Sequence, residues 1–415
     1  MQHQGVHYDT GTVFRGPGYA ISTRRSALDM SVVRRELEII RDDLRANAVR
    51  IVGSDVGRMT AVAEIALGFG IEVWFSPAFF EYSLEETADR LVAAAKAAAR
   101  LETAHPGRVV FVAGFELTLF MQGIVAGKSV TERLKRLKAD WALLSNGKLN
   151  EYLAALASRL RAGFDGPLTY ASLTFEQVDW GPFDYVGVDH YREARTKDRY
   201  VEMLKPFLAT GKPVIVTEFG MRTFHGAESS GALGFGVTDT TRLWLHTRPV
   251  IGRFVRPRLK GTFQRDEAMQ AREVAETLDE LERSGVAGAL LSTFVTPEAY
   301  TDDDPRYDLD MDAMSLVKSL PGGRHGTVYP DMHWEPKQSF SAVADFYSHH
   351  QEPTRRSPST TKLVGWGGHA ANGDDGMRRL PPCAGVGRAA SRGRSPGPTA
   401  LEAVPPRAAG APPGR

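Results

Sequence analysis

The chain has 415 residues, of which 42% are hydrophobic and 24% charged, and this composition is typical of a soluble globular protein. Its net charge of +1 gives no reason to expect nucleic acid or an anionic membrane as a partner. We find neither a secretory signal at the start of the chain nor an apolar run near the ~20 residues of a membrane-spanning helix. The single cysteine, Cys383, excludes a disulfide framework, and we therefore expect a cytoplasmic protein.

The two ends of the chain differ in charge and composition. Residues 351–415 hold 10 of the 51 Lys and Arg and 4 of the 50 Asp and Glu, which leaves 41 basic and 46 acidic residues for residues 1–350. The second segment also contains 10 Pro and 11 Gly, and it has too little apolar surface to offset the entropy of ordering it. We predict one folded domain over residues 1–350 and a disordered basic tail, most simply an inert extension, over residues 351–415.

Short apolar runs alternate with helical patterns along residues 1–350. Buried strands are predicted at 47–53, 70–77, 107–116, 167–173, 183–191, 213–218 and 286–294, with an eighth, blurred by glycines, at 11–21. Helices are predicted between them, including one at 32–45, one that starts at the capping box of Ser83 and Glu86, and a closing helix at 338–347. Eight strands, each followed by a helix, predict an α/β fold of the (β/α)8 or TIM-barrel type. A doubly wound open sheet shows the same alternation, but no Gly-rich phosphate fingerprint follows the first strand.

A long insertion separates the seventh predicted strand from its helix. It covers residues 221–260, whereas such connections usually have about 2–6 residues. In a TIM barrel a segment that follows a strand lies on the catalytic face. The insertion contains aromatic side chains such as Trp244 and Phe254 and several arginines. It is either a solvated excursion or oligomer contact, or a lid that offers aromatic and cationic groups to a ligand.

Two glutamates stand at the ends of predicted strands. Glu116 ends the fourth strand and Glu218 ends the seventh, so the two face each other across the mouth of an eight-stranded barrel. Retaining glycoside hydrolysis needs such a pair, about 5–5.5 Å apart, in which one carboxylate attacks the anomeric carbon and the other protonates the leaving oxygen. The apolar neighbours of Glu116, Phe115 and Leu117, favour the raised pKa that a general acid requires.

The sequence VTEFG at 216–220 resembles the nucleophile signature of the clan A glycoside hydrolases, which are TIM barrels. The resemblance implies that Glu218 is the nucleophile and Glu116 the general acid/base of a retaining glycosidase. It also implies a carbohydrate or glycoside substrate, with no cofactor and no metal. The oligomeric state is left open.

The same resemblance assigns supporting roles to other strand-end residues. Arg50, in AVRIVG, resembles the second-strand arginine that supports the nucleophile. Tyr191, in VDHY, resembles the sixth-strand residue that hydrogen-bonds the nucleophile, and His190 is the neighbouring option. Clan members usually carry Asn before the acid/base, where this chain has Phe115. Many carry Trp after strand eight as a sugar platform, where this chain offers Phe294.

Three segments resemble an uncharacterised actinobacterial family that is commonly labelled "abortive infection protein". They are YDTGTVF at 8–14, DPRYDLDM at 304–311 and MHWEPKQSFSAVADFY at 332–347. The label implies phage defence. An alternative function is therefore a catalytically inactive barrel that binds a carbohydrate or a defence-related partner.

A metal-dependent function is a further alternative. Glu116, Asp189, His190 and Glu218 could hold a metal ion, as in sugar isomerases of the xylose isomerase type, although adjacent residues of a regular strand point to opposite faces. The six aspartates at 302–312 suggest calcium, but they lack the EF-hand spacing. We predict a solvated loop there.

Overall fold

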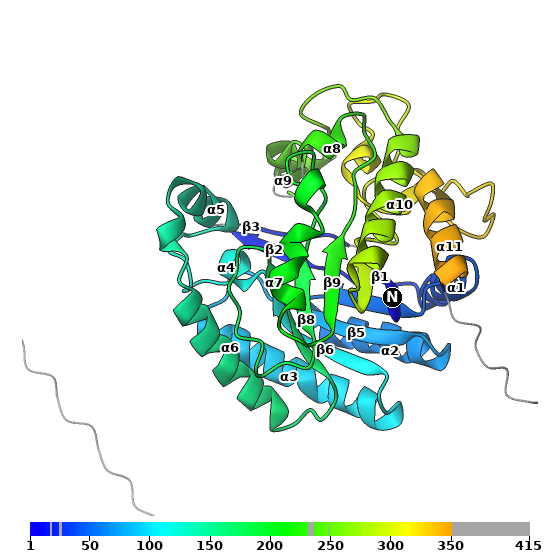
Figure 1. Cartoon of the computed structure of the whole chain (residues 1–415). Helices are drawn as coiled ribbons and strands as arrows, with labels where there is room; N and C mark the ends of the chain where they lie inside the picture. The colour runs from blue at the N-terminus through cyan, green and yellow to red at the C-terminus, as the bar shows by residue number, and fades with distance from the viewer. Residues whose placement is uncertain (17–18, 25–26, 231–235, 249, 351–415) are drawn as a thin grey trace, which may run out of the picture. The chain divides into compact units, whose positions relative to one another are not determined.

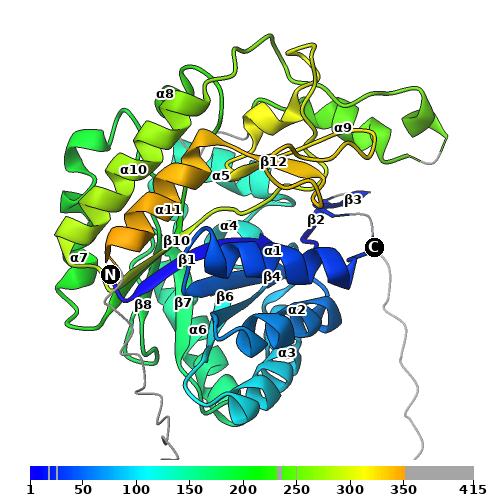
Figure 2. The ribbon, with the colours of Figure 1, turned by 90° about the vertical axis from the view of Figure 1, so that its right-hand side faces the viewer.

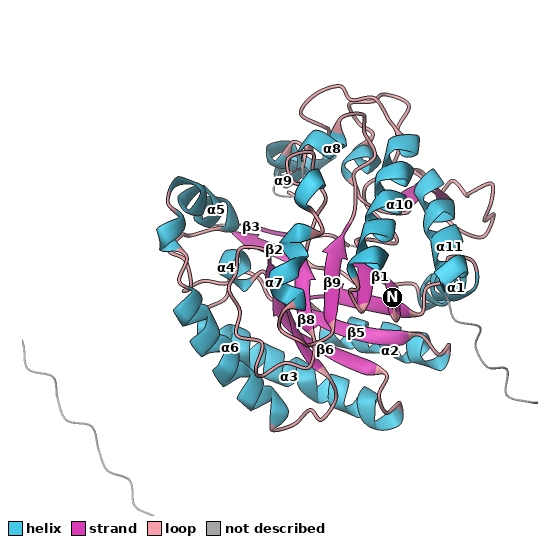
Figure 3. Ribbon diagram, in the orientation of Figure 1, coloured by secondary structure: helices cyan, strands magenta, loops and turns pink. Residues whose placement is uncertain are grey.

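The computed structural model describes residues 1–16, 19–24, 27–230, 236–248 and 250–350, so the predicted tail lies outside the described residues. Eight parallel strands close into a barrel in the order β1-β10-β9-β8-β7-β6-β5-β4, and helices surround it (Figures 1 and 3). The strands are β1 (His3–Asp9), β4 (Ala48–Gly53), β5 (Glu72–Pro77), β6 (Val109–Phe115), β7 (Leu168–Leu173), β8 (Val186–Asp189), β9 (Val214–Phe219) and β10 (Gly288–Leu291). The predicted TIM barrel is confirmed.

The first barrel strand is β1 and not the predicted segment 11–21, which is a correction to the sequence analysis. That segment lies in β2 (Val13–Gly16) and β3 (Tyr19–Ser22), an antiparallel hairpin outside the barrel. Figure 2 shows the hairpin beyond the end of β1 that lies opposite the N-terminus. The sequence of β1 is HQGVHYD, in which polar side chains such as His3 and His7 are buried. It therefore lacks the apolar run that marks the other strands.

Long helices cover the barrel. They are α1 (Met30–Asp42), α2 (Val56–Gly68), α3 (Leu84–Ala104), α6 (Asn146–Arg161), α10 (Glu267–Ser284) and α11 (Gln338–His350). The capping box of Ser83 and Glu86 is present at the start of α3 as predicted. The connection between β7 and β8 differs from the predicted alternation of strands and helices, because residues 174–185, all of them described, contain no helix. No helix among the described residues is long and apolar enough to span a bilayer.

The shorter elements lie in the connections. They are α4 (Leu117–Phe120), α5 (Val130–Ala139), α7 (Lys205–Leu208), α8 (Ala227–Ser230), α9 (Thr240–His246), the 3-10 turns η1 (Trp141–Leu143), η2 (Lys197–Arg199), η3 (Glu202–Leu204), η4 (Ile251–Arg253) and η5 (Leu309–Asp312), and the small sheet of β11 (Val317–Ser319) and β12 (Trp334–Pro336). The long insertion after β9 contains α8, α9 and η4.

The aspartate-rich loop after β10 is anchored to the protein and is not simply solvated as predicted. Asp310 lies 2.9 Å from the buried Lys337 ammonium and 2.9 Å from Arg265. Asp312 accepts hydrogen bonds from the backbone of Val237 and Thr238, at 3.0 Å each. The loop after the eighth barrel strand thereby fixes the base of the insertion that follows the seventh.

Candidate active site

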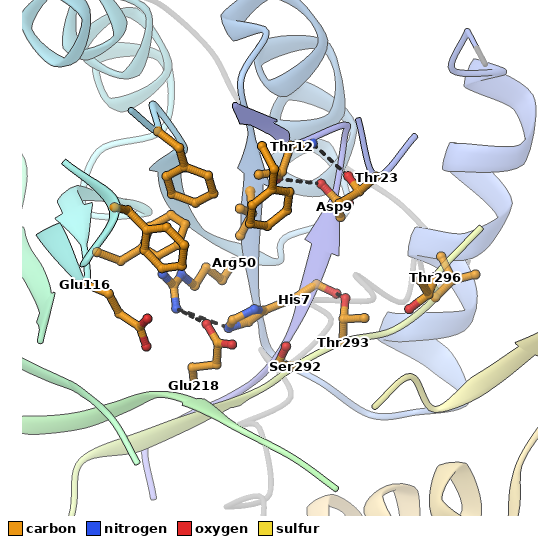
Figure 4. A pocket seen from close by; sticks show the side chains of 16 residues that line it. His7, Asp9, Thr12, Thr23, Arg50, Glu116, Glu218, Ser292, Thr293 and Thr296 are labelled. Atoms are coloured by element: carbon orange, nitrogen blue, oxygen red, sulfur yellow. Dashed lines mark hydrogen bonds and ion pairs between the residues drawn. The ribbon is translucent and has the colours of Figure 1, made fainter. Parts of the chain in front are cut away.

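A cavity of about 270 Å³ opens at the carboxyl ends of the barrel strands. Glu116, which directly follows the fourth barrel strand β6, and Glu218, near the end of the seventh strand β9, both line it. Figure 4 shows the two carboxylates at this cavity, with Arg50 labelled beside Glu218. The structure therefore brings together the two glutamates that the sequence analysis paired.

Glu218 is held by groups that stabilise a negative charge. The Tyr191 hydroxyl donates a hydrogen bond to its Oε1, and the Arg50 Nη1 atom lies 3.6 Å from its Oε2. A register shift between β8 and β9 places Asp189 opposite Glu218. The side chain of Glu218 is 23% exposed, so the carboxylate remains accessible from the cavity.

Arg50 is fully buried and connects three strands. Its Nη1 donates to the Thr217 carbonyl at 2.8 Å and its Nε to the Ser76 hydroxyl at 3.1 Å. The same Nη1 lies 3.5 Å from Asp189 Oδ1, which also accepts from the Thr217 hydroxyl at 2.6 Å. Burial raises the pKa of Asp189 to about 7, although the Arg50 charge acts in the opposite direction. Arg50 is thus the shared cation of two carboxylates, Asp189 and Glu218.

Of the two sequence candidates after β8, only Tyr191 reaches Glu218. The ring of His190 stacks on the ring of Tyr200, with centroids 4.0 Å apart, and its Nε2 lies 2.9 Å from the Tyr200 carbonyl. Burial lowers the pKa of His190 to about 4. His190 therefore cannot complete the metal-ligand set with Glu116, and no group of three or more His, Cys, Asp or Glu among the described residues is arranged to hold a metal ion.

Glu116 is positioned by an unusual backbone turn. Its φ of 47° and ψ of 39° lie in the left-handed region, which non-glycine residues seldom adopt. The turn follows an irregularity in the pairing of β6 with β7 between Val112 and Phe115, and bulges of this kind re-aim side chains near active sites. The Glu116 amide donates to the Ala171 carbonyl at 2.9 Å, which fixes the turn.

The surroundings of the Glu116 carboxylate favour its protonated form. Burial raises the pKa of Glu116 well above its usual value, and the negative charges of Asp189 and Glu218 raise it further. No side chain in the described part of the chain donates a hydrogen bond to this carboxylate. A protonated carboxylic acid at neutral pH is what a general acid needs.

Phenylalanines form the wall of the cavity beside Glu116. Phe80, Phe115 and Phe120 all line the cavity, and the rings of Phe80 and Phe120 stack at 4.2 Å. The Arg50 guanidinium lies 5.0 Å from the centre of the Phe115 ring. Phe115 therefore occupies the position before the acid with an apolar surface that cannot hydrogen-bond a sugar hydroxyl.

Phe294 does not lie at the cavity, contrary to the predicted sugar platform. Its side chain is fully buried and packs edge-on against Trp334, with ring centroids 5.5 Å apart. Ser292 and Thr293 line the cavity at the end of β10 instead. The chain after β10 thus directs the aromatic ring into the core.

Several cavity residues were missed by the sequence analysis. His7, Asp9, Thr12 and Thr293 all line the cavity and carry polar groups. His7 and Asp9 belong to β1, the strand that the sequence analysis misplaced, and the His7 Nε2 lies 2.8 Å from the Thr217 carbonyl. Correct placement of the first strand would have put both residues at the mouth of the barrel.

A second cavity of about 540 Å³ adjoins the first, and we call it the cleft extension. Phe14, Thr23 and Thr296 line both cavities. Leu243 and His246 of α9 belong to its lining, so part of the insertion after β9 forms a wall of the cleft. Most of its lining surface is apolar, with contributions from Ile21, Pro257, Ala299, Tyr300 and Leu309, while Arg256, Glu298, Asp302 and Asp312 add charged groups.

The barrel is similar in fold to several solved glycoside hydrolases, whereas no protein-family model and no curated protein matches the sequence. A GH113 β-1,4-mannanase superposes with a TM-score of 0.51 at 13% identity, over 83% of this chain and 98% of that one. A GH2 β-galacturonidase from Eisenbergiella tayi gives 0.50 at 15% identity, over 84% and 51% of the two chains. The β-glucuronidase of Ruminococcus gnavus gives 0.50 at 12% identity, over 85% and 50%.

This chain spans about half the length of the latter two proteins. At such identities the likeness shows the fold alone, a glycoside hydrolase-like TIM barrel. It gives no support to the abortive-infection label.

Proposed function

We propose that the protein is a retaining glycoside hydrolase in which Glu218 is the nucleophile and Glu116 the general acid/base. The observation that carries the proposal is the contrast between two carboxylates of one cavity. One is surrounded by a hydroxyl donor and a guanidinium, and the other by phenylalanine rings and negative charge. Such a division of environments is what assigns nucleophile and acid in a two-carboxylate mechanism.

In the first step Glu218 attacks the anomeric carbon while the bond from that carbon to the leaving oxygen breaks. Glu116 donates its proton to the leaving oxygen, so a glycosyl ester of Glu218 forms and Glu116 becomes ionised. In the second step Glu116 accepts a proton from water, the water oxygen attacks the anomeric carbon, and Glu218 is released as a carboxylate. Tyr191 and Arg50 hold Glu218 in position for both steps.

The two adjoining cavities suggest where the parts of a glycoside substrate would bind. The reacting sugar would occupy the smaller cavity, where His7, Asp9 and Thr12 offer polar groups to its hydroxyls. The remainder of the substrate would extend into the cleft extension, whose apolar lining suits a hydrophobic group or the apolar faces of further sugars.

The test is covalent trapping. Purified protein would be screened against a panel of aryl glycosides, and the 2-deoxy-2-fluoro derivative of the best substrate would then be used to trap the glycosyl ester. We expect mass spectrometry of the digested protein to locate the label on Glu218. The Glu218→Gln variant should remain unlabelled, whereas Glu202→Gln, a change at an exposed acid, should label normally. Label on another residue, or hydrolysis that survives Glu218→Gln, would refute the assignment.

A barrel that binds a carbohydrate without cleaving it is the second candidate. Phe115 favours it, because this side chain gives the site no amide before the acid. Saturable binding of an oligosaccharide with no turnover, unchanged in both glutamate variants, would select this candidate over the first.

A further inference from the structure

The β2–β3 hairpin separates the catalytic cavity from a different one. Successive side chains of a strand point to opposite faces, and Phe14 lines the catalytic cavity while its neighbours Val13 and Arg15 line a cavity of about 480 Å³. We call the latter the arginine cavity, because Arg15, Arg24, Arg58 and Arg90 are among its lining residues. It lies over the ends of β1, β4 and β5.

The arginine cavity is strongly cationic. Its lining includes four arginines and one acid, Asp55, whose carboxylate is engaged as the N-cap of α2 and accepts from the Arg58 amide at 3.1 Å. The positive charge of the cavity contrasts with the net negative charge of residues 1–350, which hold 41 basic and 46 acidic residues. A concave site lined by positive charges raises the local concentration of anions.

Two of these arginines lie against the same aromatic ring and are not paired with an acid. The Arg90 guanidinium lies 3.9 Å from the centre of the Tyr82 ring, and that of Arg15 lies 5.3 Å from the same ring. Neither side chain forms an ion pair with any residue that the structure describes. An anion within reach of both guanidinium groups would offset the repulsion between their charges.

Arg24 adds positive charge to the cavity, but its Nε and Nη2 atoms are buried and have no hydrogen-bond partner among the described residues. Burial raises the pKa of Glu36 and the charge of Arg24 acts in the opposite direction, so this guanidinium acts on the buried carboxyl of Glu36. We therefore expect an anion in the cavity to contact Arg15, Arg58 and Arg90, and to interact with Arg24 through its charge alone.

We propose that the arginine cavity binds a phosphoryl-type oxyanion. Arginine forms paired N–H bonds to two oxygens of such a group, which makes it the preferred residue for this chemistry. A phosphoryl group there would connect Arg15 of the hairpin to Arg90 of α3 and Arg58 of α2. The hairpin carries Phe14 on its other face, so an anion that fixes the hairpin also fixes one wall of the catalytic cavity.

The test measures binding and does not depend on any hydrolytic activity. Titration calorimetry and thermal unfolding with inorganic pyrophosphate, at ionic strength held constant with sodium chloride, should show one saturable site and a rise in Tm. Arg15→Gln and Arg90→Gln should each weaken binding about tenfold or more. Arg100→Gln, an exposed position of the same helix α3, should bind like the wild type.

Two results would overturn the proposal: no saturable binding to the wild type, or equal affinity in wild type and Arg90→Gln. Circular dichroism of each variant without ligand checks its folding, and Arg15→Lys, on the exposed hairpin, keeps the charge and removes only the paired geometry. A comparison of inorganic phosphate with glucose 6-phosphate distinguishes the source of the group. Equal affinity indicates a free oxyanion, and tighter binding of the sugar phosphate indicates a phosphorylated carbohydrate.

Discussion

The two glutamates line the same cavity, but the groups around one favour the ionised carboxylate and the groups around the other favour the protonated acid. Glu218 receives a hydrogen bond from Tyr191 and lies beside Arg50, whereas Glu116 lies near phenylalanines and other carboxylates, without a described side-chain donor. The difference shows how the same residue type can serve as nucleophile at one strand end and as general acid at another. The side chains on the neighbouring strands determine which role each glutamate takes. The following changes alter one side of the comparison at a time.

The largest effect is expected from the glutamates themselves. Glu218→Gln removes the nucleophile and should lower kcat by roughly 10⁶-fold, the scale seen when a covalent nucleophile is lost. Glu116→Gln should lower kcat/KM, which reports the first step, by about 10²–10⁴-fold for a poor leaving group, and far less for dinitrophenyl glycosides, whose leaving group needs no proton. With the latter substrates kcat should still fall, because the second step has lost its general base. Steady-state kinetics with both kinds of substrate checks this. Equal leaving-group dependence in the two variants would contradict the assigned roles.

Arg50→Met removes the cation that Asp189 and Glu218 share. Because Arg50 and Asp189 are both fully buried, we expect a loss of about 3–5 kcal/mol in the free energy of unfolding at pH 8. The loss should be smaller at pH 5, because the pKa of Asp189, already about 7, rises further without Arg50 and a protonated carboxyl needs no cation. Urea unfolding at both pH values measures this. Arg136→Met, which breaks an exposed ion pair, should cost under about 0.5 kcal/mol.

Tyr191→Phe removes the hydroxyl that donates to Glu218. A hydrogen bond to a charged group contributes about 1.5–3 kcal/mol, so kcat/KM should fall by roughly 10- to 150-fold with little change in the unfolding transition. Tyr200→Phe removes a hydroxyl that, among the described residues, donates to the His190 carbonyl alone, and we expect it to leave kcat unchanged. If the two variants behaved alike, the role of Tyr191 at the nucleophile would be wrong.

Phe115→Asn changes the apolar surroundings of Glu116, and we expect it to have the smallest effect of these variants. Activity requires protonated Glu116, so it should fall as pH rises through the raised pKa of that group. A polar side chain that admits water should lower this pKa, and with it the alkaline limb of the kcat/KM profile should move to lower pH. Phe79→Leu, a change at a position outside the catalytic cavity, should leave the profile in place. An unmoved alkaline limb in Phe115→Asn would show that Phe115 does not set the pKa of Glu116.

The sequence was sufficient to predict those features that depend on local pattern. The apolar runs of β6 and β9 end at Glu116 and Glu218, and closure of eight such strands brings their ends to one rim. It indicated Tyr191 as the partner of the nucleophile, with His190 as the neighbouring option, but it could not show the register shift between β8 and β9 that places this part of β8 opposite Glu218. Nor could it predict the first strand, since His7 is buried through contacts with distant residues such as Thr217.

Phe294 and Asp310 show the same limit. The direction of the Phe294 ring depends on its packing with Trp334, which lies 40 residues further along the chain by the numbering. Asp310 belongs to an acidic run whose sequence predicts a solvated loop, but in the structure Lys337 and Arg265 lie against it. In both cases a partner that is distant in sequence decides where the side chain lies.

The anchoring of the insertion by Asp312 has a consequence for protein engineering. One carboxylate accepts from Val237 and Thr238 and lies 3.1 Å from Arg222, so two separate chain segments share a single attachment point. Grafting a foreign insertion onto this scaffold would leave the partly buried Asp312 carboxylate without these partners. A successful chimera must therefore transplant the segments after β9 and after β10 as one unit.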